Sequence, residues 1–148
     1  MPRLLLFEPD IGRRLSLVDA LRDRYEIALP EPGSAPVRAV RGTRPHLVLL
    51  AMRPGNVHAT PRACRAIKSE PHAPKVGIVG RRDGGFSAAQ LLAHYQADGV
   101  MWGDATPEQL FGWLDDLEQG RQPIADHRDR EGVLGRAWRR LKRERGPK

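Results

Sequence analysis

The sequence predicts an α/β protein built on a doubly wound parallel sheet of five strands, and three observations support this. Five short apolar runs alternate with five stretches of helical character over the first 120 residues, as in βαβ units. The central run, Leu47–Leu50, is apolar without interruption, which is typical of a strand buried on both faces. Parallel strands need crossover helices, which are right-handed and cover both faces of the sheet. The predicted strands are Leu4–Phe7, Tyr25–Leu29, Leu47–Leu50, Val76–Val79 and Gly99–Trp102.

The first helix follows the first strand directly. Pro9 stops the strand, and Asp10 is a suitable N-cap for the helix. Apolar residues then recur at helical spacing, and we expect them to face the sheet. They are Ile11, Leu15, Leu17, Val18 and Leu21.

Caps and prolines mark the other helices. A weak helix is predicted over 34–41, with Pro36 in its first turn. Another runs to about Lys68, and a third opens at Ser87. Thr106–Gln109 is a capping box, and it introduces a last helix with a strongly apolar side. That side is formed by Leu110, Trp113, Leu114 and Leu117.

Composition limits the class of protein. The single cysteine, Cys64, excludes an internal disulfide framework and suits a reducing compartment. No apolar run approaches the roughly 20 residues of a membrane span, and the N-terminus does not resemble a signal peptide. We therefore expect a soluble, cytoplasmic protein. The net charge of +7 is concentrated at the C-terminus: residues 121–148 hold ten Lys and Arg against four Asp and Glu, whereas residues 1–120 hold 15 against 14.

The end of the central strand is the expected place for chemistry, because ligands of open α/β sheets collect at the carboxyl ends of the strands. The segment Arg44–Gly55 reads RPHLVLLAMRPG. After its apolar run come Ala51, which carries no reactive group, and a turn that leaves the sheet.

Across residues 2–119 the chain resembles the receiver domains of response regulators, the CheY-like family. Four segments carry the resemblance: LLLFEPD at 4–10, RPHLVLLAMRPG at 44–55, APKVGIVGRRD at 73–83 and QADGVMWGDATPEQL at 96–110. The resemblance implies a flavodoxin-like sheet in the order 2-1-3-4-5, with the site at the carboxyl edge of strands 1, 3, 4 and 5. It also implies a role in two-component signal transduction.

The family's acidic positions are poorly preserved in this sequence. The acidic pair that holds Mg²⁺ falls on Glu8 and Pro9, so one carboxylate is missing. The phospho-accepting aspartate falls on Ala51, which has no nucleophile. An acyl phosphate needs a carboxylate, and Mg²⁺ needs several oxygen ligands. We therefore expect no phosphorylation here and no bound metal.

The other functional positions of the family are also lost. The hydroxyl residue that holds the phosphoryl group falls on Gly80, and the lysine that pairs with it falls on Gly103. The aromatic switch residue falls on Val100. The resemblance is thus to a degenerate receiver without its aspartate.

A glycine-rich loop after the fourth predicted strand is a candidate anion site. Backbone N–H groups and guanidinium groups together are suited to phosphate or carboxylate. A charged, solvated loop is the alternative. The candidate residues are Arg81, Arg82, Gly84 and Gly85.

Aromatic residues gather near the last predicted strand and its flanking helices. One alternative is that these aromatic residues, Tyr95, Trp102 and Trp113, belong to the core. The other is that they anchor a partner or a second copy, since this helix–strand–helix face is the usual interface of the family that the chain resembles. Both alternatives remain open from the sequence.

The C-terminal part is predicted as a linker over 120–129 and a basic amphipathic helix over 130–145. Trp138 and Leu141 belong to the apolar side of that helix. Three roles remain open: docking on a partner, contact with nucleic acid or acidic lipid, or a solvated charged end.

These observations predict a non-enzymatic, phosphorylation-independent protein-interaction or scaffold module of bacterial-type signalling, without a cofactor. The alternative is a nucleic-acid-associated transcriptional regulator that uses the basic C-terminal helix.

Overall fold

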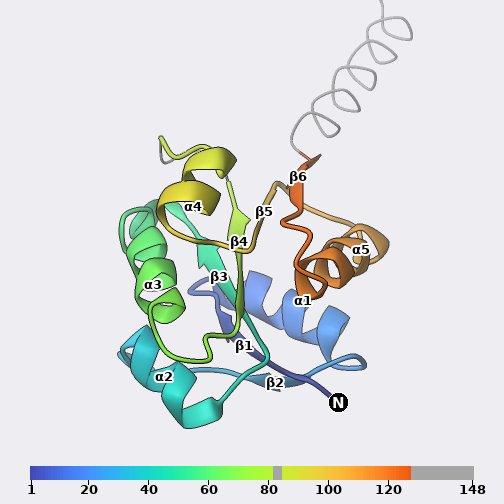
Figure 1. Cartoon of the computed structure of the whole chain (residues 1–148). Coiled ribbons are helices and arrows are strands. Elements are labelled where there is room, and N and C mark those ends of the chain that lie inside the picture. The colour runs from blue at the N-terminus through green and yellow to red at the C-terminus, as the bar shows by residue number, and fades with distance from the viewer. Residues whose placement is uncertain (82–84, 128–148) are drawn as a thin grey trace, which may run out of the picture.

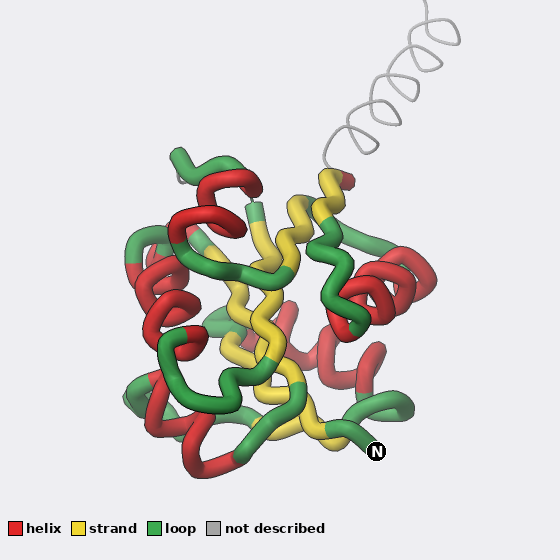
Figure 2. Tube along the Cα trace, viewed as in Figure 1, coloured by secondary structure: helices red, strands yellow, loops and turns green. Residues whose placement is uncertain are grey.

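The computed structural model describes residues 1–81 and 85–127. A single parallel sheet forms the middle layer, and helices cover both of its faces (Figures 1 and 2). The strands are β1 (Arg3–Phe7), β2 (Glu26–Ala28), β3 (Leu47–Met52), β4 (Lys75–Gly80), β5 (Gly99–Trp102) and β6 (Ile124–Asp126). The helices are α1 (Ile11–Leu21), α2 (Pro36–Thr43), α3 (Ala59–Lys68), α4 (Ala88–His94) and α5 (Pro107–Glu118), with a 3₁₀ turn, η1, at Pro54–Asn56.

The order of the strands is β2-β1-β3-β4-β5-β6, and every neighbouring pair is parallel. The predicted fold class and the order of its five strands are confirmed. The predicted number of strands is wrong, because Ile124–Asp126 adds a sixth strand beside β5. This strand lies inside the segment 120–129 that the sequence suggested as a linker. Three residues between polar neighbours are too few to show the period of a strand.

Two apolar layers hold the helices on the sheet. α1 and α5 cover one face, where Leu4, Leu6 and Leu49 meet Trp113 and Leu117. α2, α3 and α4 cover the other face, onto which the alternate strand residues project. All six residues of β3 are buried, as its uninterrupted apolar run predicts.

The predicted inward side of α1 is only partly correct. Asp10 caps the helix, as expected, by accepting a hydrogen bond from the backbone N–H of Arg13 at 2.8 Å. Leu21 is fully buried, but the side chains of Ile11 and Leu15 are 65% and 64% exposed. Helical periodicity gives the spacing of an apolar side, and the crossing angle of the helix on the sheet decides how much of that side is covered.

The C-terminal ends of α1 and α5 are tied together. The hydroxyl of the buried Tyr25 donates to Glu118 Oε1 at 2.6 Å, and burial together with this carboxylate raises the pKa of Tyr25. Arg24 pairs with Asp115 at 2.5 Å and lies over the ring of Phe111. No such contact links the N-terminal ends of the two helices in the described chain, apart from one ion pair described below. The two helices can therefore enclose a hollow at that end.

Candidate functional site at the carboxyl edge of the sheet

The carboxyl ends of β1, β3, β4 and β5 meet at one edge of the sheet, because these strands are parallel neighbours. Glu8 follows β1, Arg53 follows β3 and Arg81 follows β4. Asp104 comes two residues after β5. The chain thus brings charged residues from four separate segments to one place.

A buried ion pair between Glu8 and Arg53 lies at the centre of this edge. The side chain of Glu8 is fully buried, and that of Arg53 is 15% exposed. Arg53 Nε lies 3.1 Å and 3.2 Å from the two carboxylate oxygens, and Nη2 also donates to Oε1. The arginine therefore gives both oxygens of Glu8 a charge-assisted partner.

The turn after β3 holds Arg53 in place. Its backbone N–H donates to Asn56 Oδ1 at 2.7 Å, and Asn56 Nδ2 donates to the carbonyl of Ala51 at 3.0 Å. Arg53 is not among the residues that the sequence predicts for the site, because its partner Glu8 lies 45 positions away and no local pattern joins them. Its position directly after the central strand was the one available signal.

Ala51 is 1% exposed and belongs to the apolar layer that contains Val79 and Met101. It presents no carboxylate, and the nearest buried carboxylate, Glu8, is already paired. Within the described ranges there is no group of three His, Cys, Asp or Glu residues that could hold a metal ion.

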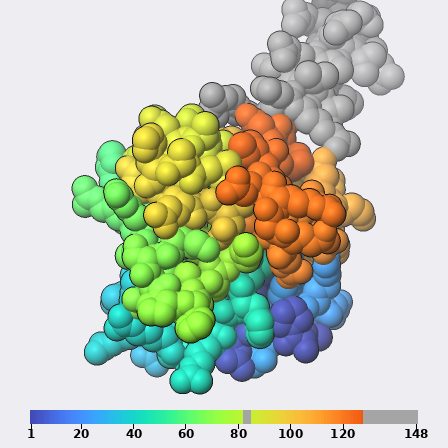
Figure 3. All heavy atoms as spheres, in the orientation of Figure 1, coloured from blue at the N-terminus to red at the C-terminus, as the bar shows by residue number. Residues whose placement is uncertain are grey.

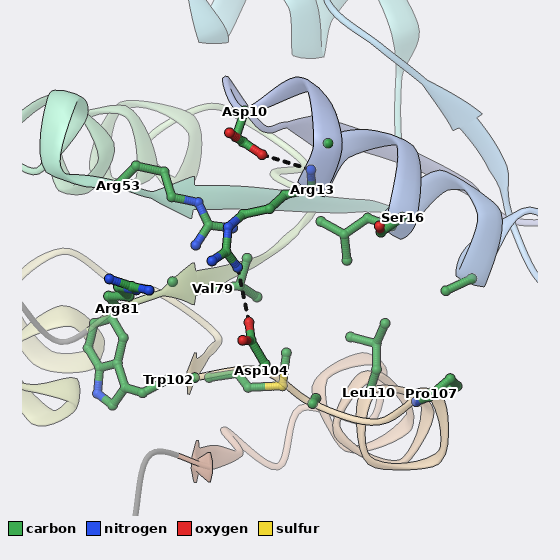
Figure 4. Close-up of a pocket in the computed structure, with 17 residues that line it drawn as sticks. Asp10, Arg13, Ser16, Arg53, Val79, Arg81, Trp102, Asp104, Pro107 and Leu110 are labelled. Carbon is green, nitrogen blue, oxygen red and sulfur yellow. Dashed lines mark hydrogen bonds and ion pairs between the residues drawn. The ribbon is translucent and has the colours of Figure 1, made fainter. Parts of the chain in front are cut away.

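A crevice of about 950 Å³ opens beside the ion pair, between the N-terminal ends of α1 and α5 (Figure 4). Its floor is apolar and includes Leu17, Val79, Met101 and Leu110. A smaller hollow of about 500 Å³ adjoins it on the side of the η1 turn. Three arginines line both hollows, namely Arg13, Arg53 and Arg81.

Two carboxylates share this rim. Asp104 pairs with Arg13 at 3.0 Å, with side chains 71% and 37% exposed, so this pair is largely solvated. Asp10 is engaged by the N-terminus of α1. Arg81 is exposed and has no hydrogen-bond or ion-pair partner among residues 1–81 and 85–127.

The single thiol does not contribute to this site. Cys64 is fully buried in α3, and burial, with a smaller effect of Asp98 that outweighs the opposing effect of Lys68, raises its pKa to about 12. A thiol of that kind is a poor nucleophile at neutral pH.

No family model matches the sequence, and no curated protein matches it. Solved structures do match. The N-terminal domain of the nisin resistance regulator NsrR, a lantibiotic response regulator, aligns with a TM-score of 0.69 at 10% identity, over 80% of this chain and 98% of its own. The signal receiver domain of a response regulator from Bermanella marisrubri gives 0.64 at 17% identity, over 78% and 96%. The pseudo-receiver domain of CikA gives 0.56 at 20% identity, over 79% and 97%.

This chain has the receiver-domain fold. The strand order supports the same assignment, because β2-β1-β3-β4-β5 is the order that the sequence resemblance implies. β6 is an addition to that order. In the described part of the chain, no helix has the length and apolar character needed to cross a membrane.

Two glycines at which the sequence resemblance places functional residues of a receiver have positive φ. Gly80 has φ +150°, and a Cβ atom there would lie 2.2 Å from the carbonyl oxygen of Met52 on the neighbouring strand. Gly103 has φ +84°. Side chains are strained in such conformations, so the backbone at Gly80 and Gly103 disfavours any residue that has a side chain.

Gly80→Thr, which restores a receiver-like hydroxyl, is expected to destabilise the protein by about 3 kcal/mol or more through this overlap and the positive φ. Gly112→Thr is the matched control, because Gly112 lies in α5 with no atom near its Cβ position, and it should change stability by no more than about 0.5 kcal/mol. Urea unfolding of both variants is the measurement. Equal stability of the two variants would contradict the close approach of β3 and β4 at Gly80.

The structure favours the core alternative for two of the three aromatic candidates. Trp102 and Trp113 are 2% and 4% exposed, so neither is available as a surface anchor on this domain. Trp113 Nε1 donates to the carbonyls of Val100 and Pro123 at 3.1 Å and 3.3 Å. Tyr95 is half-buried and makes an edge contact with Phe86.

β6 also changes the surface on which a partner or second copy was expected. It lies beside β5, and in Figure 3 the orange-red atoms of this segment adjoin the yellow atoms of α4. A homodimer through the last helix–strand–helix face would therefore have to include β6. That dimer remains a prediction.

Several predicted residues fall partly or wholly outside the described ranges. Of the glycine-rich loop, Arg81 and Gly85 are described, and Gly85 has φ +76°, whereas Arg82 and Gly84 are not. Trp138 and Leu141 of the predicted basic helix also lie outside.

Val100, by contrast, is described. It is buried within β5, in the apolar layer between the sheet and the helices α2, α3 and α4.

Proposed function

We propose that this protein is a receiver-fold signalling module that binds a protein partner, is not an enzyme, and does not take up a phosphoryl group on its central strand. The observation that carries the proposal is the Glu8–Arg53 ion pair beside Ala51. The arginine supplies the positive charge at this edge and uses the oxygens that a divalent cation would need. The central strand offers no carboxylate to form an acyl phosphate.

Two further observations support an interaction role. One of the similar structures is named a pseudo-receiver domain, that of CikA. The described surface also carries two large apolar side chains one turn apart on α1, those of Ile11 and Leu15. Side chains of that kind are suited to contact with another protein.

The protein is expected to be silent toward phosphoryl donors. Acetyl phosphate should add no phosphoryl group to the intact protein by mass spectrometry, and Mg²⁺ with beryllofluoride should leave the amide NMR signal of residue 51 unchanged. Ala51→Asp alone should not restore a response, because Gly80 and Gly103 still provide no hydroxyl and no lysine. A phosphoryl group added to the unmodified protein, or a Mg²⁺-dependent, saturable shift at residue 51, would overturn the proposal.

The interaction role is tested on the full chain by affinity capture followed by reconstitution with the purified partner. Ile11→Gln with Leu15→Gln should weaken that complex tenfold or more, whereas Leu29→Gln is the control, since Leu29 is also exposed, at 48%, but follows β2 and does not belong to α1. Acetyl phosphate should not change the affinity. A complex that forms only after treatment with a phosphoryl donor would contradict the proposal.

A second candidate function is nucleic-acid-associated regulation through the C-terminal segment. The observation that favours it is the charge of residues 121–148, with ten basic residues against four acidic. Binding to DNA or RNA would then weaken steeply with salt. Neutralising Arg139, Arg140, Lys142 and Arg143 should abolish it, while the α1 variant should leave it intact.

A further inference from the structure

The three arginines at the strand edge point to a ligand. Arg13 comes from the first turn of α1, Arg53 from the turn after β3 and Arg81 from the end of β4, and all three line both adjoining hollows. Figure 4 shows their side chains directed into this space from the three elements. Like charges brought together from separate elements repel one another, and an anion between them relieves that repulsion.

The charges around the hollow leave guanidinium groups available. Arg53 turns its Nε and Nη2 edge toward Glu8, which leaves Nη1 without a protein partner in the described ranges. Arg81 has no partner there either. Arg13 is held by the exposed carboxylate of Asp104, an attachment worth only about 0–1 kcal/mol that an incoming anion can replace. The remaining carboxylate on the rim, Asp10, is engaged by the helix N-terminus.

Arg53 is also held rigidly in advance of any ligand. The buried Glu8 fixes one edge of the guanidinium, and Asn56 fixes the backbone. A cation that is fixed before binding loses little conformational freedom when an anion arrives. Glu8 therefore acts on a ligand only through its hold on Arg53.

The apolar floor defines the rest of the ligand. Leu17, Val79, Met101 and Leu110 line the larger crevice, whose volume of about 950 Å³ lies in the range of small-molecule sites. A bare inorganic ion would leave this surface in contact with water. An organic body attached to the anionic group would cover it.

We propose that the crevice binds a small organic anion, a carboxylate or phosphate group on an apolar or aromatic body. The anionic group lies among Arg13, Arg53 and Arg81, and the apolar body lies over the floor between α1 and α5. This proposal goes beyond the function proposed above and does not depend on it. The site differs from the predicted glycine-rich loop, with which it shares Arg81.

The test uses the full chain and four probes in isothermal titration calorimetry: 1-naphthyl phosphate, 1-naphthoate, the neutral 1-naphthol and inorganic phosphate. The two naphthyl anions should bind at least tenfold more tightly than 1-naphthol and than inorganic phosphate. The tighter of the two anions identifies the preferred anionic group. Equal affinity for 1-naphthol and both anions would show apolar adsorption only and would overturn the proposal.

Variants locate the binding. Arg81→Ala and Arg13→Ala should each lower the affinity for the naphthyl anions roughly tenfold or more, as expected for loss of a charge-assisted hydrogen bond. Arg22→Ala is the matched control on α1, because Arg22 is 69% exposed and lies at the other end of the helix. Unfolding curves of the three variants should coincide with that of the unmodified protein. If both crevice variants bind as tightly as the control, the site is elsewhere and the proposal is wrong.

Discussion

Arg53→Met is expected to destabilise the protein by about 3–5 kcal/mol, because it leaves the charge of Glu8 buried without a partner. The side chain of Glu8 is fully buried, so water cannot replace the lost guanidinium. Guanidinium unfolding with linear extrapolation measures the change.

Two further variants separate this cause from general damage. The double variant Glu8→Gln with Arg53→Met removes both charges, and it should recover most of the lost stability, since buried ion pairs are often replaced at little net cost. Arg22→Met breaks an exposed pair with Asp19 and should cost less than about 1 kcal/mol. A loss below about 1 kcal/mol for Arg53→Met would contradict the burial of this pair.

Trp113→Ala is expected to cost about 3–5 kcal/mol, as large-to-small changes of buried aromatic residues do. The ring of Trp113 fills space that glycine on β4 leaves free: a Cβ atom at Gly77 would lie 2.5 Å from Trp113 Cη2. The same indole donates to the carbonyls of Val100 and Pro123 and so holds the start of β6. We therefore also expect the variant to show faster amide hydrogen exchange at residues 124–126.

Trp113→Phe separates the two contributions. It keeps an apolar ring in the cavity but removes the indole N–H, so it should cost less than Trp113→Ala and still loosen β6. Hydrogen exchange followed by NMR reports both effects. Unchanged protection at 124–126 in Trp113→Phe would show that β6 is held by its strand pairing alone.

Much of the fold could be predicted because its signals are local. Apolar runs and caps predicted the first five strands and the order of the helices, and the caps at Asp10 and Thr106 are present as expected. β6 was missed because three residues are too few to show the alternation of apolar and polar residues that marks a strand. The exposure of Ile11 and Leu15 was missed because spacing along a helix does not determine how much of its apolar side the sheet covers.

The site was less predictable because its signals are non-local. The sequence predicted that Ala51, Gly80 and Gly103 supply no phosphoryl chemistry, since each residue type alone excludes it. It could not predict what occupies the space instead. The pairing of Arg53 with Glu8 depends on β1 and β3 lying side by side. Arg13 and Arg81 come to the same crevice only because the carboxyl ends of the parallel strands share one edge of the sheet.

β6 also determines where the chain leaves the domain. α5 runs back along the sheet, and Gly120 comes close to the Lys75 side chain at the start of β4, so the chain without β6 would leave at the amino edge. β6 runs parallel to β5 and returns the chain to the carboxyl edge, where Asp126 is paired with Trp102, a residue that lines the crevice. The described part of the chain therefore ends at the edge of the sheet at which the crevice opens. Residues 121–148, with ten basic residues against four acidic, are thus joined to the domain at the edge that carries Arg13, Arg53 and Arg81, and both sets of charges attract anions to that edge.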